Sequence, residues 1–393
     1  MNFNVIWKLL GSTENQSTLR WLGVSLVAVI GIGWVAYEEL YKKDPPKPSS
    51  AHTQETPQPV ISNAYAENHY LWQTNAEGND IHIIDIENQQ VIKRIIVGPR
   101  PNGIATDAQT SYIYVTVETN SGNHGELLYI NPITFDIEYR LSICAEPHSL
   151  AITPNGMWAY IPCWQDGEYW VVDTLNKKVV KKIMTGGRPH NTSVSQDGKY
   201  MYLSPMWGED KVIIVDVDAG HTVIDHIPYS NSLRPPALSA DNKYLFQHID
   251  ALNGFQVANV THRKVIATIK HTKRLGWYMR YESEGWLNYD GFHKCHGLAI
   301  HPNQSEIWSC CGKWVHVNSI IEPGYPEIYS INVSDDVYWI TFSPDGKYSF
   351  PAIADDNLVA MVDVKLRKVI KYFKVGNRPK RNLVITLNSK QNK

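Results

Sequence analysis

The segment Arg188-Pro-His-Asn-Thr-Ser-Val-Ser-Gln-Asp-Gly-Lys-Tyr-Met-Tyr-Leu-Ser204 decides the fold of this 393-residue chain. It has the pattern of a short strand, a Gly-containing turn and a second strand in which aromatic and apolar residues alternate. The pattern returns at residues 147–161 and 295–309, and in weaker form at residues 337–348 and 101–107. A strand–turn–strand unit that recurs along the chain predicts an all-β repeat protein.

Alignment of these turns gives seven equivalent positions, each at the start of a predicted innermost strand. They are Asn102, His148, His190, Arg234, His296, Tyr338 and Lys380, separated by 46, 42, 44, 62, 42 and 42 residues. A period near 42 residues with four strands in each repeat is typical of a β-propeller. The last copy, residues 378–386, has no blade after it, and residues 70–97 lack an inner strand before them. The sequence therefore predicts seven blades, with the C-terminal strand closing the ring.

The residues before the repeats predict a membrane anchor and a tether. Residues 21–37 (WLGVSLVAVIGIGWVAY) are 17 residues without a charge, near the lower limit for a membrane-spanning helix. A cleaved signal peptide is the rival interpretation, but no small-x-small cleavage site follows closely. Lys8 and Arg20 precede the span and favour a cytoplasmic N-terminus. The predicted parts are a cytoplasmic segment (1–18), an anchor (19–38), a Pro-rich linker (39–67), the propeller (68–388) and a tail (389–393).

This topology predicts a single-pass protein of the inner membrane with the propeller on the periplasmic side. The chain has 37 Lys and Arg residues and 39 Asp and Glu residues, for a formal net charge of -2. Because the charges balance and form no long basic run, we expect no nucleic-acid partner.

Three features resemble the YVTN-repeat, YncE-like seven-bladed propellers. They are the turn Ser343-Pro-Asp-Gly-Lys-Tyr348, the Gly-x-Arg-Pro sequence at residues 98–101 and 376–379, and apolar third strands that end in Asp173, Asp216 and Asp363. The resemblance covers about residues 68–388 and implies the propeller fold. It does not imply one function, because such propellers include binding proteins, enzymes and subunits of redox complexes.

The seven equivalent positions predict a polar ring around one mouth of the central channel. His148, His190 and His296 come from three blades, and neutral imidazoles are good ligands for copper or zinc. The same mouth is also rich in cationic residues that hold carboxylates or phosphates in proteins. The predicted ligand-binding residues are Arg100, Asn102, Arg188, Arg234, Tyr338, Arg378, Lys380, Trp164 and Trp207. A third interpretation is a solvated channel with no ligand, and the residues leave all three open.

The loops between second and third strands share this predicted face. They include residues 164–168, 206–210, 248–250 and 312–316, which are rich in Trp, His and carboxylates. The 62-residue spacing marks an insertion of residues 273–294 with many aromatic side chains. This insertion predicts a lid, a docking surface for a protein partner, or packing against neighbouring blades.

The five cysteines predict a disulfide-permissive compartment. Hairpin register places Cys295 opposite Cys311, and Cys163 opposite Pro147 near Cys144. Two disulfides with Cys310 free would suit an oxidising compartment. A soft-metal site of Cys295, Cys311 and His296 is the alternative, although no CxxC spacing supports it.

These patterns favour a membrane-anchored extracytoplasmic propeller that binds a partner protein or a small ligand, with a periplasmic redox system as one setting. The alternative is a copper- or zinc-dependent oxidoreductase with a three-His site. A lactonase-like hydrolase would need a carboxylate or metal site that the sequence does not locate, so the sequence leaves open whether the protein is an enzyme and what its cofactor is.

Overall fold

The computed structural model describes residues 67–119, 122–272, 279–282, 285–288, 295–334 and 336–388. The predicted cytoplasmic segment, anchor and C-terminal tail, and nearly all of the linker, lie outside these residues. Within the described ranges, no helix is long and apolar enough to cross a membrane.

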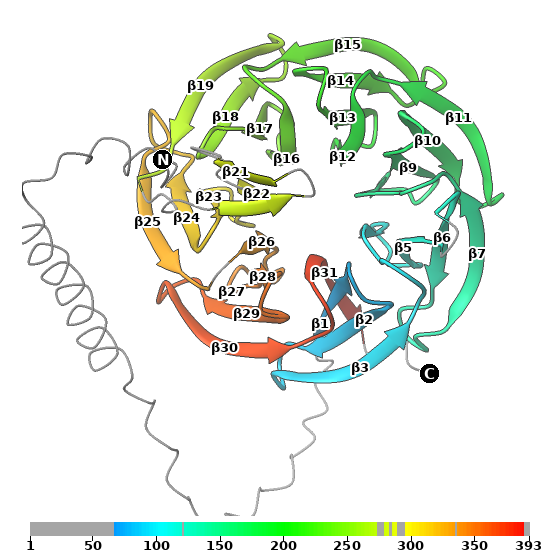
Figure 1. Cartoon of the computed structure of the whole chain (residues 1–393), viewed down its shortest axis with the longest axis horizontal. Helices are drawn as coiled ribbons and strands as arrows, with labels where there is room; N and C mark the ends of the chain where they lie inside the picture. The colour runs from blue at the N-terminus through cyan, green and yellow to red at the C-terminus, as the bar shows by residue number, and fades with distance from the viewer. Residues whose placement is uncertain are drawn as a thin grey trace, which may run out of the picture. The chain divides into compact units, whose positions relative to one another are not determined.

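Seven antiparallel sheets surround a common centre, as Figure 1 shows. We number the blades by the order of their outer strands along the chain. The innermost strands of blades 1 to 7 are β31 (Pro379–Asn388), β4 (Ile104–Thr106), β8 (Ala151–Ile152), β12 (Arg188–Val194), β16 (Leu233–Leu238), β22 (Cys295–Ile300) and β26 (Val337–Trp339). The second strands are β1 (Glu67–Asn75), β5 (Ile113–Glu118), β9 (Trp158–Cys163), β13 (Tyr200–Met206), β17 (Tyr244–Ile249), β23 (Glu306–Cys311) and, in blade 7, the two short strands β27 (Tyr348–Ser349) and β28 (Ala352–Ile353).

The third and outer strands complete each blade. The third strands are β2 (Asp80–Asp85), β6 (Gly125–Ile130), β10 (Glu168–Asp173), β14 (Lys211–Asp216), β18 (Gly254–Asn259), β24 (Trp314–Ser319) and β29 (Leu358–Asp363). The outer strands are β3 (Gln90–Ile96), β7 (Ile137–Ile143), β11 (Lys178–Met184), β15 (Thr222–Pro228), β19 (Lys264–Lys270), β25 (Glu327–Asn332) and β30 (Lys368–Lys374). The predicted all-β seven-bladed propeller is therefore confirmed.

Burial follows the position of each strand in its blade. The third strand β29 is buried at its four central residues, as a strand covered on both faces should be. The outer strand β30 is mostly exposed but buries Phe373. Its lysines lie along the edge of the sheet, where charge discourages pairing with another chain.

The repeated turn has the same local structure in several blades. The hydroxyl of Ser195 donates to Asp197 at 2.6 Å, and the hydroxyl of Ser343 donates to Asp345 at 2.7 Å. Gly198 and Gly346 follow with φ of 73° and 71°, a conformation that favours glycine. The Ser-x-Asp-Gly motif therefore forms a hydrogen-bonded turn.

The C-terminal strand closes the ring as predicted. β31 pairs with β1 from Glu67 opposite Asn388 to Gln73 opposite Asn382. Gln73 Nε2 also donates to the backbone oxygen of Arg381 at 2.9 Å. This pairing leaves blade 1 without an open inner edge.

Candidate functional site

The register of the inner strands keeps the predicted ring positions equivalent. In blades 5 and 6, Leu233 lies opposite Ile249 and Cys295 lies opposite Cys311, and a bulge then adds one residue to the inner strand. Asn102, His190 and Arg234 each lie two residues before a regular strand pair, namely Ile104 with Val115, Thr192 with Leu203 and Pro236 with Gln247.

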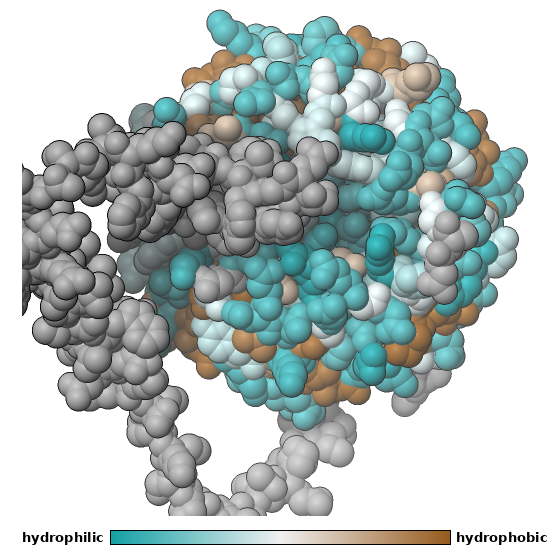
Figure 2. All heavy atoms as spheres, viewed as in Figure 1, coloured by the Kyte–Doolittle hydropathy of each residue, from teal (hydrophilic) through white to brown (hydrophobic). Residues whose placement is uncertain are grey.

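Arg381, which the turn alignment missed, follows Lys380 and donates to the side-chain oxygens of Asn102 and Asn191. Figure 2 shows hydrophilic residues around the part of the central hollow that is visible.

The three predicted histidines come together at this centre. The ring centroids of His148 and His190 are 4.9 Å apart, and those of His190 and His296 are 5.7 Å apart. His296 also stacks on Tyr338 with 3.8 Å between centroids. His148 Nδ1 and both ring nitrogens of His296 are buried without a hydrogen-bond partner among the described residues. Two of the three imidazoles, those of His148 and His296, therefore have unused hydrogen-bonding capacity.

Arg381 is a buried cation beside these histidines. Its side chain is among the largest fully buried ones, and the residue is 2% exposed. Its guanidinium donates to Asn102 Oδ1 and, at 3.5 Å, to Asn191 Oδ1, while its Nε has no partner. In the part of the chain that the structure describes, Arg381 forms no ion pair with a carboxylate. Its positive charge is thus held by neutral groups, the two amides and the ring of Trp339, whose centroid lies 5.1 Å from its guanidinium carbon.

The tautomer of His190 follows from Asn191. Asn191 Oδ1 accepts from Arg381, so its amide nitrogen faces His190 and donates to Nδ1. A neutral His190 then carries its proton on Nε2. The imidazole therefore presents an N–H donor, and this tautomer is suited to an anion.

Burial keeps all three imidazoles neutral at pH 7. It lowers the pKa of His148 to about 4, with a further contribution from Arg381 and Lys380 against the opposing effect of Glu146. Burial likewise holds the pKa values of His190 and His296 well below the usual range, and Arg381 and Arg234 lower both further. The same positive field that keeps the histidines neutral attracts an anion.

Most of the other predicted cations are already neutralised. Arg234 pairs with Asp250, and Arg100 Nη1 lies 2.8 Å from Glu118 Oε2. Arg378 contacts three carboxylates, those of Glu77 at 3.2 Å, Asp336 at 3.5 Å and Asp355 at 2.9 Å. Lys380 places its Nζ 5.3 Å from the centre of the Tyr338 ring. Lys380 and Arg381 are therefore the cations best placed to meet a ligand.

Two predicted tryptophans form an aromatic wall at the mouth. Trp164 stacks on His148 with 5.1 Å between centroids and meets Trp207 edge-on at 5.2 Å. Arg188 donates to the backbone oxygen of Trp164 at 3.1 Å and lies over its ring. Trp207 is 55% exposed, so an apolar surface remains open beside the polar centre.

Two of the predicted loops lie only partly between strands. His248 and Ile249 belong to β17, and Trp314 to His316 begin β24. Their hydrogen bonds to neighbouring strands continue past the expected turn, which leaves short connections. Of the insertion 273–294, the structure describes the two-stranded hairpin β20 (Met279–Glu282) and β21 (Gly285–Asn288). The rest of the predicted lid or docking surface lies outside the described residues.

Both cysteine pairs are disulfides, Cys144–Cys163 and Cys295–Cys311, and Cys310 is a buried free thiol. The pairing that hairpin register favoured is therefore confirmed. The alternative soft-metal group with His296 is not formed, and a different histidine, His248, lies beside Cys295 and Cys311.

Comparisons with known proteins support the fold and go no further. No protein-family model and no curated protein matches the chain. A hydrazine synthase structure from Kuenenia stuttgartiensis is 18% identical with a TM-score of 0.61, and the match covers 75% of this chain and 92% of that one. The Pseudomonas aeruginosa periplasmic gluconolactonase PpgL is 13% identical with a TM-score of 0.65, over 81% of this chain and 99% of that one.

The dihydro-heme d1 dehydrogenase NirN, solved with DHE, is 11% identical with a TM-score of 0.55, over 80% of this chain and 74% of that one. At these identities the likeness concerns the fold alone. The chain is thus similar to propellers that carry out unrelated chemistry, and its function has to be argued from its own residues.

Proposed function

We propose that this protein is an extracytoplasmic binding propeller that holds a small carboxylate- or phosphate-bearing ligand at the channel mouth. The observation that carries the proposal is Arg381, a fully buried guanidinium that no described carboxylate neutralises. A buried charge without a partner costs several kcal/mol, and a bound anion would remove that cost. Guanidinium groups also bind carboxylate and phosphate oxygens in pairs, which fixes the ligand's orientation.

The surrounding residues fit the same ligand. His190 presents its Nε2–H, and His296 has both ring nitrogens free of described partners. Lys380 directly precedes Arg381 in β31 and adds a second positive charge. Neutral donors around a cation can contact an anion without a competing negative charge, so we assign Arg381, Lys380, His190 and His296 to ligand binding.

The test is ligand binding by the purified full-length chain with phosphate and gluconate as probes. We expect at least one probe to bind and to raise the melting temperature, since a ligand that binds only the folded state stabilises it. Arg381→Met should abolish that shift, whereas Arg140→Met, on the outer strand β7, should retain it. Equal shifts in both variants, or no shift with wild type and either probe, would contradict the proposal.

A copper or zinc site of His148, His190 and His296 is the second candidate. Its support is that the three imidazoles are neighbours and are held neutral, the state that binds metals. Two features oppose it. Metal-binding histidines usually donate their other N–H to an acceptor, but Nδ1 of His190 faces the donor amide of Asn191. A cation is also repelled by Arg381, and two unit charges about 6 Å apart interact by roughly 3 kcal/mol at an effective dielectric constant of about 20.

Metal analysis separates the two candidates. The metal site predicts about one copper or zinc per chain, by the logic of three-His sites. The bound metal would be lost in His190→Ala. It would be retained in His262→Ala, because His262 lies on a turn between β18 and β19. The anion site predicts a wild-type chain with no bound copper or zinc at this position.

We further propose that the propeller is tethered to the inner membrane by residues 19–38 and lies in the periplasm. Two disulfides support an oxidising compartment. The uncharged segment at residues 21–37 lacks a nearby cleavage site. The chain should remain with membranes after a carbonate wash, and a mature protein that begins after Tyr37 would contradict the tether.

A further inference from the structure

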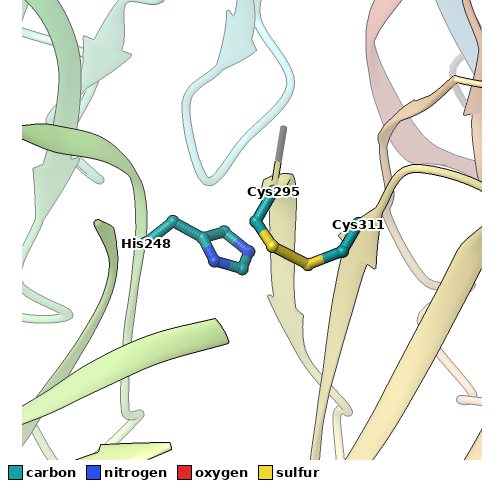
Figure 3. A group of neighbouring side chains, drawn as sticks. All are labelled: His248, Cys295 and Cys311. Atoms are coloured by element: carbon teal, nitrogen blue, oxygen red, sulfur yellow. A yellow bond between two sulfur atoms is a disulfide. The ribbon is translucent and has the colours of Figure 1, made fainter. Parts of the chain in front are cut away.

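A second polar group lies between blades 5 and 6, next to His296 of the proposed anion site but formed by other residues. It consists of His248 near the end of β17, Cys295 at the start of β22 and Cys311 at the end of β23. All three residues are buried, and the two cysteines face each other across a strand pair as a disulfide. Figure 3 shows the imidazole of His248 directed at the two sulfur atoms.

The tautomer of His248 suits a metal ligand. Its Nδ1 lies 2.8 Å from the backbone oxygen of Gly254, and its Nε2 lies 3.4 Å from that of Gly297. A neutral imidazole has one N–H, and the much shorter contact assigns it to Nδ1, so Nε2 keeps its lone pair. Histidines that bind metals are typically held in this way, with the second nitrogen donating to a carbonyl or carboxylate. Burial also lowers the pKa of His248 to about 3, so the ring stays neutral.

Ser309 stands where a fourth donor would be needed. Its Oγ lies 3.2 Å from His248 Nε2 and 3.3 Å from Cys311 Sγ. With zinc–sulfur bonds near 2.3 Å and zinc–nitrogen bonds near 2.0 Å, neighbouring ligand atoms of a tetrahedral ion are about 3.4 Å apart. The hydroxyl therefore has the separation from both atoms that a shared ion requires.

We propose that reduction of the Cys295–Cys311 disulfide creates a binding site for a thiophilic ion, Zn²⁺ or Cu⁺, formed by both sulfurs, His248 Nε2 and the Ser309 hydroxyl. A dithiol reductant breaks the sulfur–sulfur bond, becomes a disulfide itself and leaves two thiols. The ion then forms two metal–sulfur bonds, and the two thiol protons pass to solvent. The oxidised protein would not bind the ion, so the site reports the redox state of its surroundings.

Two other groups of metal-binding residue types are less suitable. The rings of His271 and His316 are stacked at 4.0 Å and only 2° from parallel, next to Glu327. An imidazole lone pair lies in the ring plane, so one ion cannot lie in both of these planes. Cys144 and Cys163 form a disulfide beside the exposed Asp166, without an imidazole. This second disulfide provides a matched control.

The experiment uses the full-length chain with one cysteine pair retained at a time. The variant Cys144→Ser/Cys163→Ser keeps the proposed site, and Cys295→Ser/Cys311→Ser keeps only the control disulfide. Both are reduced with a phosphine, dialysed against Zn²⁺ and analysed for bound metal. We expect about one zinc per chain in the first variant when reduced, less than a tenth of that when oxidised, and less than a tenth in the second variant.

His248→Gln provides a test that leaves all the cysteines in place. It should still form the Cys295–Cys311 disulfide but bind zinc at least tenfold more weakly after reduction. Zinc should raise the melting temperature of the reduced wild type and not that of His248→Gln. The proposal would be overturned by unchanged zinc affinity in His248→Gln or by equal zinc content in both cysteine variants. It would also be overturned by a reduced wild type that unfolds, or that stays folded but binds no zinc.

Discussion

Arg378 and Arg381 lie three residues apart at the start of the closing strand, and their environments are opposite. Arg378 is 27% exposed at its side chain and contacts the carboxylates of Glu77, Asp336 and Asp355. Arg381 is buried and contacts neutral groups, the amide oxygens of Asn102 and Asn191 and the ring of Trp339. One segment thus contains a cation whose charge is balanced by the protein and a cation whose charge is not.

The difference separates a structural role from a binding role. Glu77 comes from blade 1, whereas Asp336 and Asp355 come from blade 7, so Arg378 connects residues on either side of the ring closure. Arg381 has no such carboxylates and adds its field to three neutral histidines. We therefore expect changes at the two arginines to affect different properties, and the following predictions test that division.

The largest effect should come from removal of both arginines with their strand. Deletion of residues 378–393 takes β31 away from β1 and leaves a full edge of unpaired backbone groups. We expect no soluble, folded protein by size-exclusion chromatography and thermal melting. Deletion of residues 389–393 alone, beyond the last residue of β31, should leave the solubility and the melting temperature unchanged. A 378–393 deletion that melts like wild type would show that β31 does not close the ring.

Single substitutions should separate binding from stability. We expect Arg381→Met to lose more than tenfold in affinity for the anionic probe, measured by calorimetry. Its free energy of unfolding should stay within about 1 kcal/mol of wild type, because relief of an unpaired buried charge offsets two lost hydrogen bonds. Arg378→Met should keep the affinity and lose about 1 kcal/mol of stability, the magnitude of a partly exposed ion-pair network. The reverse pattern would contradict the assigned roles.

Acid should destabilise the protein, and Arg381 should account for part of that sensitivity. The pKa of a histidine in an unfolded chain is about 6.5, whereas burial lowers the pKa of His148 in the folded chain to about 4. Between these pH values the unfolded chain binds more protons, so stability falls as the pH falls through this window, by up to about 1.4 kcal/mol per pH unit for each such histidine.

Arg381→Met removes a positive charge that lowers the pKa of His148, His190 and His296. The decrease in unfolding free energy between pH 7 and pH 5, measured by denaturant titration, should therefore be smaller in this variant. Arg378→Met is the control and should keep the wild-type pH dependence. Other buried histidines, such as His248, contribute equally to the pH dependence of the wild type and of both variants. The difference between the variants therefore measures the contribution of the histidines at the channel mouth.

The sequence predicted those parts of the molecule that depend on regular repetition. The turn Ser343 to Tyr348 and its copies gave the seven blades, the closure by β31 and the cysteine pairs. The sequence did not predict Arg381, because an alignment of turns locates the start of each inner strand but does not show which charged side chain the blades bury. It also did not predict the position of His248 against Cys295, since that contact joins two blades separated by the irregular insertion.

The smallest predicted effect concerns the aromatic wall. It tests whether the channel mouth also contacts an uncharged part of the ligand. Trp207 is 55% exposed and contacts Trp164 edge-on, so its removal breaks little packing. If the ligand's uncharged part rests on this wall, Trp207→Ala should weaken gluconate binding about three- to tenfold, the effect of losing roughly 1 kcal/mol of ring contact. It should leave phosphate binding unchanged, because phosphate has no part that reaches beyond Arg381. Equal losses of affinity for gluconate and phosphate would show that Trp207 does not contact the uncharged part of the ligand and acts only through the structure of the charged site.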